Sequence, residues 1–447
     1  MKKAVITILG TISPPREGQE KAHYYLSQEL QKVFSLKKEN YTNMLPLLIA
    51  NLEDQYGTIR CIYTNFSKNI QSKVLRYENL DFDIRKEGVF ISENAVDEHN
   101  NEIKEAQYSY FLNQYNALIE EYDKVIIDVS HGFRHFPILA VINLIIQNIK
   151  NPQKIEHILF AKEVKQYEEY EIIDLKEYLE LANLSSMLSS FNQNYTVSSN
   201  IHFSNGLYQE LAEELNEFSH HFLSNSLKPL IEGTIIENII SNLEVLQTKE
   251  SVENFREYIE EIKEHLEEIR QLKYENEWMR LYKLSQMMDE RGYQLNAITL
   301  LFEAVGLYCL DALSQIEIVG ERLKEYRGYI EEQKEPLHIY SLYTMTNQSR
   351  VIVKIKERFK VGDSRLFINT EAMKDTIVAY LNGVDGLKKF KRFIEDLEGL
   401  RNNLAHGNSG FTIEDVKFIY KRNQKSFEKF AIKENILKDF KSFKGQN

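Results

Sequence analysis

The sequence predicts an N-terminal α/β domain with a doubly wound, mainly parallel sheet, followed by an all-helical domain. Short apolar runs alternate with helical segments over the first 180 residues, and strand-like runs stop at about residue 181. Glycine (18) and proline (7) are also scarce for 447 residues. Short buried runs joined by helices are typical of parallel sheets covered on both faces, and few chain breakers favour long helices. The length allows about two or three domains of roughly 150 residues.

The N-terminal segments alternate between strands and helices along the chain. Apolar runs rich in β-branched residues are predicted as strands at 3–9, 58–64, 124–129, 155–160 and 170–173. Helices are predicted at 19–33 and 138–149. Ligands of doubly wound sheets bind beyond the carboxyl ends of the strands. The loops after Leu9 and Val129 are therefore the candidate ligand loops.

The second half has the spacing of helices. Segments 254–274 and 276–290 are rich in Glu and Lys, with apolar positions at helical intervals. The Asn- and Ser-rich stretch 190–205 is interpreted as a loop or linker between the two halves.

Charge and cysteine content narrow the class of protein. The 55 Lys and Arg against 67 Asp and Glu give a net charge of −12, which argues against a protein coated with nucleic acid through bulk charge. Cys61 and Cys309 are the two cysteines, and their spacing excludes a disulfide scaffold and a cysteine-based zinc site. The apolar run 4–9 is too short for a signal peptide, and 138–149 is too short to cross a bilayer. We expect a cytoplasmic protein without a membrane segment.

The first candidate site follows the strand 124–129. A polar loop that contains glycine, placed between a buried strand and a helix, gathers backbone N–H groups at the positive end of the helix dipole and can bind an anion. Arginine offers a fork for phosphate, and phenylalanine or histidine can stack on bases. The loop after the first strand faces this loop and adds hydroxyl and backbone donors. The candidate ligand-binding residues are Gly10, Thr11, Ile12, Ser13, Ser130, His131, Gly132, Phe133 and Arg134.

Other interpretations of this loop stay open. Gly132 and Pro137 would also suit a simple strand-to-helix turn, with Arg134 in a surface ion pair. His131 and His135 are four residues apart and could share a metal, but the loop offers no third ligand. The chain has no Gly-Lys-Ser/Thr phosphate loop and no Gly-x-Gly-x-x-Gly, which speaks against ATP hydrolysis and dinucleotide binding.

The second candidate site ends a helix predicted at 387–406, which Gly407 would terminate. Asn402 and His406 are four residues apart and share a face, and Arg401 can reach the same edge. Histidine supplies a proton donor or acceptor near neutral pH, and arginine stabilises extra phosphate charge. These residue types suit metal-independent RNA cleavage by transesterification, with Arg401, Asn402 and His406 as catalytic residues and no cofactor. A polar helix end with capping groups is the alternative.

Local charge favours the catalytic interpretation. Residues 387–447 carry 14 Lys and Arg against eight Asp and Glu, a net charge of +6, so the rest of the chain carries −18. The candidate catalytic helix thus lies in the basic part of an acidic protein, as a restricted RNA-binding groove requires.

The two motifs together resemble a known family. An α/β domain with Asp-Val-Ser-His-Gly-Phe-Arg after a central strand (128–134), followed by a helical domain with Arg-Asn-x-x-x-His (401–406), is similar to the CRISPR-associated CARF–HEPN ribonucleases of type III systems. The resemblance spans essentially the whole chain. It implies a Rossmann-like CARF domain at 1–180, a helical linker region at 181–270 and an all-helical HEPN ribonuclease domain at 271–447. The stretch 337–382 is interpreted as an insertion in the helical domain.

The resemblance also implies partners and roles. A cyclic oligoadenylate, with cyclic tetra-adenylate favoured, would bind across a CARF homodimer and contact residues 10–13 and 130–134 of both subunits. Two HEPN domains would pair around a composite site that cuts single-stranded RNA and leaves a 2′,3′-cyclic phosphate. Arg401 would hold the phosphate, Asn402 would orient it or the histidine, and His406 would act on the 2′-hydroxyl or the leaving oxygen.

Two other functions remain possible from the sequence. One is a non-catalytic regulator, in which the sensor domain drives a helical DNA-binding or interaction module. The other is a helical nuclease that is active without cyclic oligoadenylate.

Overall fold

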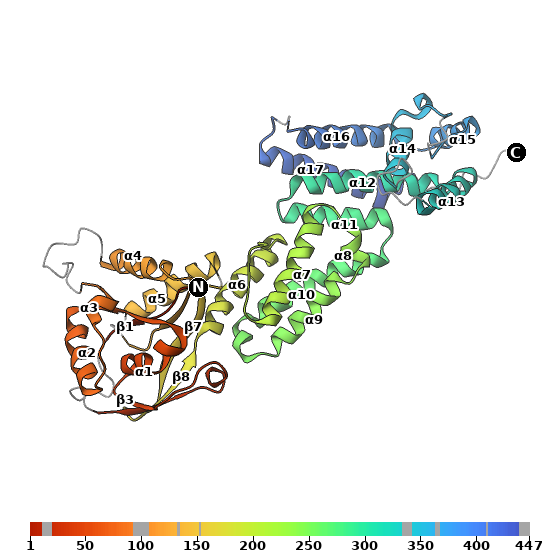
Figure 1. Ribbon diagram of the computed structural model, residues 1–447. Helices are drawn as coiled ribbons and strands as arrows, with labels where there is room; N and C mark the ends of the chain where they lie inside the picture. Colours follow the sequence, from red (N-terminus) through yellow and green to blue (C-terminus); the bar gives the residue numbers. More distant parts are fainter. Residues whose placement is uncertain are drawn as a thin grey trace. The chain divides into compact units, whose positions relative to one another are not determined.

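The computed structural model describes residues 1–10, 20–92, 107–131, 135–151, 153–332, 342–362, 367–407 and 410–437 (Figure 1). Within it the chain forms two compact units, each described here by itself. The first unit comprises Met1–Asn192, Thr196–Asn216 and Ser241–Ile259. The second comprises Gln193–Tyr195, Glu217–Ile240 and Glu260–Asn447.

The first unit is built on one eight-stranded mixed sheet. Its strands are β1 (Lys3–Ile8), β2 (Ala22–Leu26), β3 (Asn40–Tyr41), β4 (Thr58–Tyr63), β5 (Gly88–Phe90), β6 (Lys124–Asp128), β7 (Ile155–Lys165) and β8 (Glu169–Asp174). The strand order is β3-β2-β8-β7-β6-β1-β4-β5. Among these described strands only the β2–β3 and β7–β8 pairs are antiparallel. The predicted mainly parallel sheet is therefore present, with the two shortest strands at its edges.

Apolar cores cover both faces of the sheet. Side chains alternate along β1, so Val5 packs in one core and Ala4 and Ile6 pack in the other. The helices of this unit lie against these two faces. The first core holds α1 (Met44–Tyr56) and part of α2 (Asn65–Tyr77) and α3 (Ile84–Glu87), and the second holds α4 (Gln107–Glu120) and α5 (His135–Lys150). A sheet buried on both faces explains why its central strands are continuous apolar runs.

The predicted helix at 19–33 is wrong. Residues 22–26 form β2, followed by a short 3₁₀ turn at Leu30–Lys32. The segment Ala-His-Tyr-Tyr-Leu alternates between buried and half-buried positions, and Tyr24 stacks on Tyr170 of β8 with ring centroids 5.1 Å apart. Burial with a period of two, together with an aromatic pair across neighbouring strands, fits a strand. The linker predicted at 190–205 is partly right, because α6 extends to Asn194 before the helix stops.

From Lys176 onward, the part of the chain that the structure describes contains helices and no strand, as predicted. These helices are α6 (Lys176–Asn194), α7 (Gly206–Leu223), α8 (Lys228–Glu232), α9 (Ile235–Gln247), α10 (Arg256–Gln271), α11 (Glu277–Glu290), α12 (Gln294–Leu313), α13 (Glu317–Glu332), α14 (Leu342–Ile355), α15 (Glu371–Asn382), α16 (Leu387–Ala405) and α17 (Ile413–Phe427), which continues into a π-helix at Glu428–Lys433.

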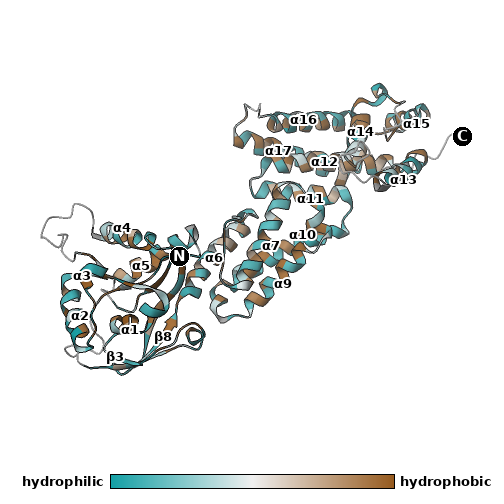
Figure 2. Cartoon of the chain, in the orientation of Figure 1, coloured by the Kyte–Doolittle hydropathy of each residue, from teal (hydrophilic) through white to brown (hydrophobic). Residues whose placement is uncertain are grey.

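Helix α12 is the central helix of the second unit. It packs against α11, α14, α16 and α17, and 15 of its 20 residues are buried. It is long and apolar enough to span a membrane, yet 72% of its most apolar window lies inside the protein, which is typical of the core helix of a soluble protein. Helix α16 has hydrophobic residues on one side and hydrophilic residues on the other (Figure 2), and its apolar side packs on α12.

Gly306 lets α14 lie close to α12. A Cβ atom at this position would lie 2.4 Å from Cγ2 of Thr346 and 2.8 Å from Nη1 of Arg350, both on α14. We expect Gly306→Ala to destabilise the second unit by about 1–3 kcal/mol, because the added methyl group overpacks this helix contact.

The single tryptophan, Trp278, donates a hydrogen bond to Asp311 of α12 (3.2 Å), so its fluorescence reports unfolding of this core. Gly328→Ala in α13 is the matched control, since a Cβ there meets nothing within 4 Å. This control should be neutral or stabilising by up to about 1 kcal/mol. Equal urea midpoints for the two variants would contradict the prediction.

Candidate functional site

The carboxyl ends of the parallel strands bring the two predicted ligand loops to one edge of the sheet. Gly10 follows β1, and Ser130 and His131 follow β6, which pairs with β1. The remaining predicted ligand residues, Thr11, Ile12, Ser13, Gly132, Phe133 and Arg134, lie outside the described residues. Helices α1 and α2 also begin at this edge, where their N-terminal N–H groups add partial positive charge.

Asp128 organises this edge. Its carboxylate is fully buried and accepts hydrogen bonds from the Thr7 hydroxyl (2.6 Å) and from the backbone N–H (3.1 Å) and hydroxyl (2.5 Å) of Ser130. The Ser130 hydroxyl oxygen accepts a bond from the Ala161 N–H (2.8 Å) in β7. One buried carboxylate therefore ties the ends of β1, β6 and β7 together and fixes the first residue of the loop.

His131 is held as a neutral imidazole. Although the residue is partly exposed, neighbouring atoms enclose its ring, and this burial lowers its pKa, opposed by the negative charge of Asp128. Its Nε2 accepts a hydrogen bond from the Met44 N–H at the start of α1 (3.4 Å), which places the ring proton on Nδ1. A neutral ring at this edge can stack on a base or donate one hydrogen bond.

Two buried amide side chains, those of Asn43 and Gln71, also lie at this edge, and neither was predicted from the sequence. The Asn43 side-chain oxygen caps α1 by accepting from the Leu45 N–H (3.1 Å), and its amide nitrogen donates to Gln71 Oε1 (3.1 Å). Gln71 in turn donates to the Gly10 carbonyl (3.3 Å). The preference of asparagine for the position before a helix could have pointed to Asn43, but nothing in the sequence links Gln71 to Gly10.

The lowered pKa of His131 predicts an acid-sensitive edge. In the unfolded chain the histidine pKa is about 6.5. As pH falls through about 6.5, the unfolded state therefore binds a proton before the folded state does. The free energy of unfolding then falls by at most about 1.4 kcal/mol per pH unit. We expect hydrogen exchange at the amides of β1 and β6 to accelerate between pH 7.5 and pH 5.5, after correction for the intrinsic exchange rate. His131→Gln should reduce this acceleration, and an unchanged acceleration in the variant would contradict the prediction.

The second predicted site lies at the end of α16. The helix ends at Ala405, one residue before the predicted end, with His406 as its C-cap and Gly407 in the left-handed conformation (φ 66°). The His406 N–H donates to the Asn402 carbonyl (3.0 Å) and the Gly407 N–H to the Leu404 carbonyl (3.1 Å). The predicted helix and its glycine terminator are confirmed.

Arg401, Asn402 and His406 are close together at this helix end. Arg401 Nη1 donates to Asn402 Oδ1 (3.1 Å), and Asn402 and His406 occupy successive turns of one face. Arg401 and Asn402 are half-buried, whereas His406 is exposed. The exposed side chain of His406 is therefore accessible to a bound molecule.

Residues from two other helices lie beneath Arg401, and sequence analysis missed them. The Arg401 guanidinium is 5.7 Å from the centre of the Phe302 ring on α12, and its charge acts on the neighbouring Glu303. Arg350 of α14 lies on the same ring at 3.4 Å. The predicted insertion at 337–382 therefore supplies a helix of the core around the site. No spacing rule connects residues 302, 350 and 401, so the sequence carried no signal for this arrangement.

The next helix after this site carries basic and apolar side chains on its exposed surface. Helix α17, which packs on α16, exposes Lys417, Lys421, Arg422 and Lys425. Phe418 on the same helix is 70% exposed. Two of these cations form ion pairs, Lys421 with Asp289 (2.7 Å) and Arg422 with Asp396 (3.6 Å). Exposed lysine and arginine side chains of this kind can attract a phosphate backbone.

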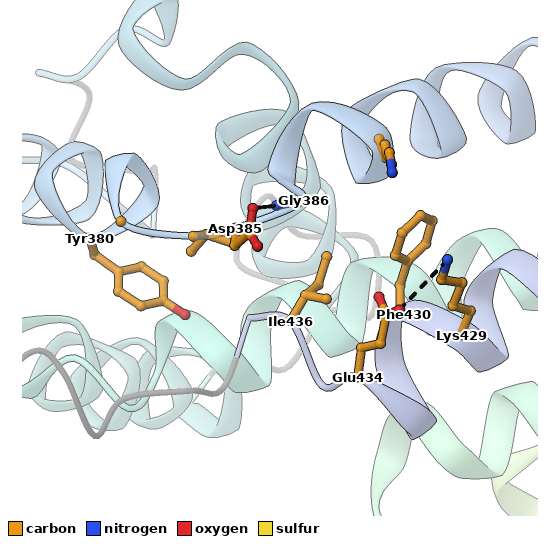
Figure 3. Close-up of a pocket in the computed structure, with 10 residues that line it drawn as sticks. Tyr380, Asp385, Gly386, Lys429, Phe430, Glu434 and Ile436 are labelled. Carbon is orange, nitrogen blue, oxygen red and sulfur yellow. Dashed lines mark hydrogen bonds and ion pairs between the residues drawn. The ribbon is translucent and has the colours of Figure 1, made fainter.

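A cavity of about 470 Å³ lies at the opposite end of α16 (Figure 3). It is bounded by Asp385 and Gly386 before α16 and by the π-helix, where Lys429 pairs with Glu434 (3.6 Å). A 19-residue helix is about 28 Å long. Because this length separates the cavity from His406, the cavity is not part of the candidate catalytic site.

The described residues contain no group of three or more His, Cys, Asp or Glu side chains that could hold a metal ion. Cys61 and Cys309 are buried, and burial raises the pKa of both thiols, so neither is an activated nucleophile.

Comparison with known proteins gives matches among solved structures only. No protein-family model matches the chain, and no curated protein matches it. A solved structure of Enterococcus italicus Csm6 bound to cyclic hexa-2′-fluoro-hexa-dAMP aligns over 98% of this chain and 99% of its own, with 13% sequence identity and a TM-score of 0.30. A TM-score of this size supports no residue-by-residue comparison, so the site assignments above depend on the contacts of this chain alone.

Proposed function

We propose that this chain is a cyclic-oligoadenylate-activated, metal-independent endoribonuclease that cleaves single-stranded RNA in the cytoplasm as part of type III CRISPR antiviral defence. Residues 1–180 are the ligand-sensing domain, 181–270 the connecting helices and 271–447 the ribonuclease domain. The observation that carries the proposal is the cluster of Arg401, Asn402 and His406 at the C-terminal end of α16.

The chemistry needs only these side chains and RNA. The 2′-hydroxyl attacks the adjacent phosphorus, the bond to the 5′-oxygen breaks, and the products are a 2′,3′-cyclic phosphate and a 5′-hydroxyl. One histidine accepts the proton of the 2′-hydroxyl, and a second donates a proton to the leaving oxygen. In a homodimer, His406 of each subunit can take one of these roles. Arg401 stabilises the charge that develops on the phosphate, and Asn402 orients Arg401.

The carboxyl edge of the sheet is the proposed activator site. Gly10, Ser130 and the neutral ring of His131 lie beside the N-termini of α1 and α2, which suits a ligand that carries both phosphates and bases. Cyclic tetra-adenylate is our first choice of activator, with cyclic hexa-adenylate as the alternative ring.

A homodimer is supported by the outer face of α5. Four apolar side chains lie there at helical spacing and are exposed in the isolated chain: Ile138 (62%), Val141 (36%), Ile142 (52%) and Ile146 (50%). Such a stripe next to the activator site is an expected contact between two sensor domains.

The decisive experiment is an RNA cleavage assay in EDTA, with no activator, cyclic tetra-adenylate or cyclic hexa-adenylate. We expect cleavage that requires one of the two rings and leaves cyclic phosphate ends. Loss of cleavage in EDTA would exclude the proposed chemistry. Cleavage that is independent of both rings would favour a constitutive helical nuclease, and tight binding of a ring without cleavage would favour a non-catalytic regulator.

A further inference from the structure

A second arginine is buried under Arg401. Arg350 of α14 is 2% exposed, and its guanidinium donates to the Phe302 carbonyl (3.1 Å) and to Asn347 Oδ1 (3.0 Å). The same group lies 3.4 Å from the centre of the Phe302 ring. A guanidinium that is almost fully enclosed needs a nearby anion, because an unpaired buried charge is costly.

Glu303 supplies that anion and serves both arginines. Its carboxylate is 3.8 Å from Arg350 Nη1, and its side chain is 23% exposed. Burial raises the pKa of Glu303, and the positive charges of Arg350 and then Arg401 oppose this rise. The carboxylate thus interacts with the two guanidiniums, and both of these lie at the Phe302 ring.

Arg401 itself is only partly satisfied by the protein. Its Nη1 bonds to Asn402, whereas its Nε is buried and has no hydrogen-bond partner among the described residues. Among the described residues Arg401 and Glu303 form no ion pair within 4 Å, so the carboxylate acts on the guanidinium through its charge, and the Phe302 ring centre lies 5.7 Å away. This leaves donors of Arg401 available for a phosphate group.

The arrangement is a poor way to stabilise a fold. Well-packed apolar residues of similar volume often stabilise a core as well as or better than a buried ion pair. The chain also keeps a glycine at 306, where a Cβ would lie 2.8 Å from Nη1 of Arg350. A cluster with this desolvation cost directly beneath a candidate catalytic arginine points to a role in the site.

We propose that Glu303 and Arg350 are positioning residues of the ribonuclease site: the charge of Glu303 orients the Arg401 guanidinium toward the scissile phosphate, and Arg350, 3.8 Å from the Glu303 carboxylate, holds Glu303 in place. This inference depends on the proposed function, since it assigns roles toward the same RNA substrate. Neither side chain contacts RNA, so both act through Arg401.

The test is a double-mutant cycle between residues 303 and 401 in the full-length chain. Activated cleavage is measured in EDTA for the wild type, Glu303→Gln, Arg401→Lys and the double variant. We expect Glu303→Gln to lower kcat about tenfold with little change in KM, and to lower it less than twofold when Arg401 is already lysine. Equal losses in both backgrounds would overturn the proposal.

Glu398→Gln is the matched control. It breaks the ion pair between Lys354 and Glu398, which joins α14 to α16 one turn before Arg401. The control should lower kcat less than twofold. A tenfold loss in the control would mean that any break between these helices disturbs the site, and would overturn the specific role of Glu303.

Arg350→Met tests the second half of the proposal, with Trp278 fluorescence as the check of folding. A folded variant should lose kcat about tenfold, and Arg350→Lys should restore part of that loss because lysine keeps the charge. If Arg350→Met does not fold, the kcat of Arg350→Lys is the test, and a value equal to the wild type or partly reduced supports the role. A neutral Arg350→Gln variant with the full wild-type kcat would overturn the role.

The inference and the proposed function fail in different ways. If the wild-type chain cleaves no RNA with either ring, the proposed function fails. The cycle is then measured as affinity for a 2′-deoxy oligonucleotide, which the chain binds without cleavage. Coupling between 303 and 401 in that affinity would support the positioning role, and the absence of binding or of coupling would overturn it.

Discussion

Replacing His406 with alanine is expected to reduce activated RNA cleavage by about 100- to 10,000-fold, the range that a positioned acid or base contributes. His406 is exposed at the C-cap of α16, and its backbone N–H bond to Asn402 does not depend on the side chain. The substitution therefore removes the proton-transfer group without removing a packing contact. Single-turnover cleavage in EDTA measures the effect, and affinity for a 2′-deoxy oligonucleotide should change little.

His220→Ala is the matched control for this prediction. His220 is also an exposed histidine in the last turn of a helix, α7, and it lies far along the chain from the basic segment. Its replacement should leave the cleavage rate within twofold of the wild type. A His406→Ala chain that cleaves at the rate of this control would exclude His406 from the chemistry.

Asp128→Ala is expected to cost about 3 kcal/mol of stability at the carboxyl edge of the sheet and to abolish the response to activator. The substitution removes the acceptor of three hydrogen bonds and leaves the buried Thr7 hydroxyl and the Ser130 donors without it. The loop that begins at Ser130 then loses its anchor to β1. Hydrogen exchange at β1 and β6 measures the local stability, and titration with cyclic tetra-adenylate or hexa-adenylate measures the response.

Asp123→Ala is the control at the other end of β6. Asp123 is exposed and accepts one hydrogen bond from the Lys2 N–H (2.6 Å), so its removal should cost less than about 0.5 kcal/mol. Wild-type exchange rates and activator response in Asp128→Ala would show that the buried carboxylate does not organise the proposed activator site.

Local patterns were enough to predict the central strands and the site helix. Strands β1, β4 and β6 are short runs rich in β-branched residues, a composition typical of strands that are buried on both faces. Helix α16 has apolar residues at helical spacing and is followed by a glycine. In these segments the local preference and the tertiary environment agree, so either one predicts the outcome.

The features that could not be predicted from the sequence depend on contacts between segments that are far apart along the chain. Residues 22–26 pair with β8 more than 140 residues later, and the stack of Tyr24 on Tyr170 outweighs the helical appearance of the segment. Around the candidate site, Arg401, Asn402 and His406 are contiguous on one helix and could be predicted together. Glu303 and Arg350 come from two other helices, and only the packing of α12 against α14 at Gly306 brings them under Arg401.

The edges of the sheet have a consequence for the behaviour of this protein at high concentration. β3 has two residues and β5 has three, so neither edge presents a long row of free N–H and C=O groups to another chain. Open edges are where sheets join into aggregates, and very short edge strands prevent this. Short edge strands therefore disfavour association of two chains through the described edges of this sheet. A variant with β5 extended by alternating valine and threonine should form insoluble fibres where the wild-type chain stays in solution.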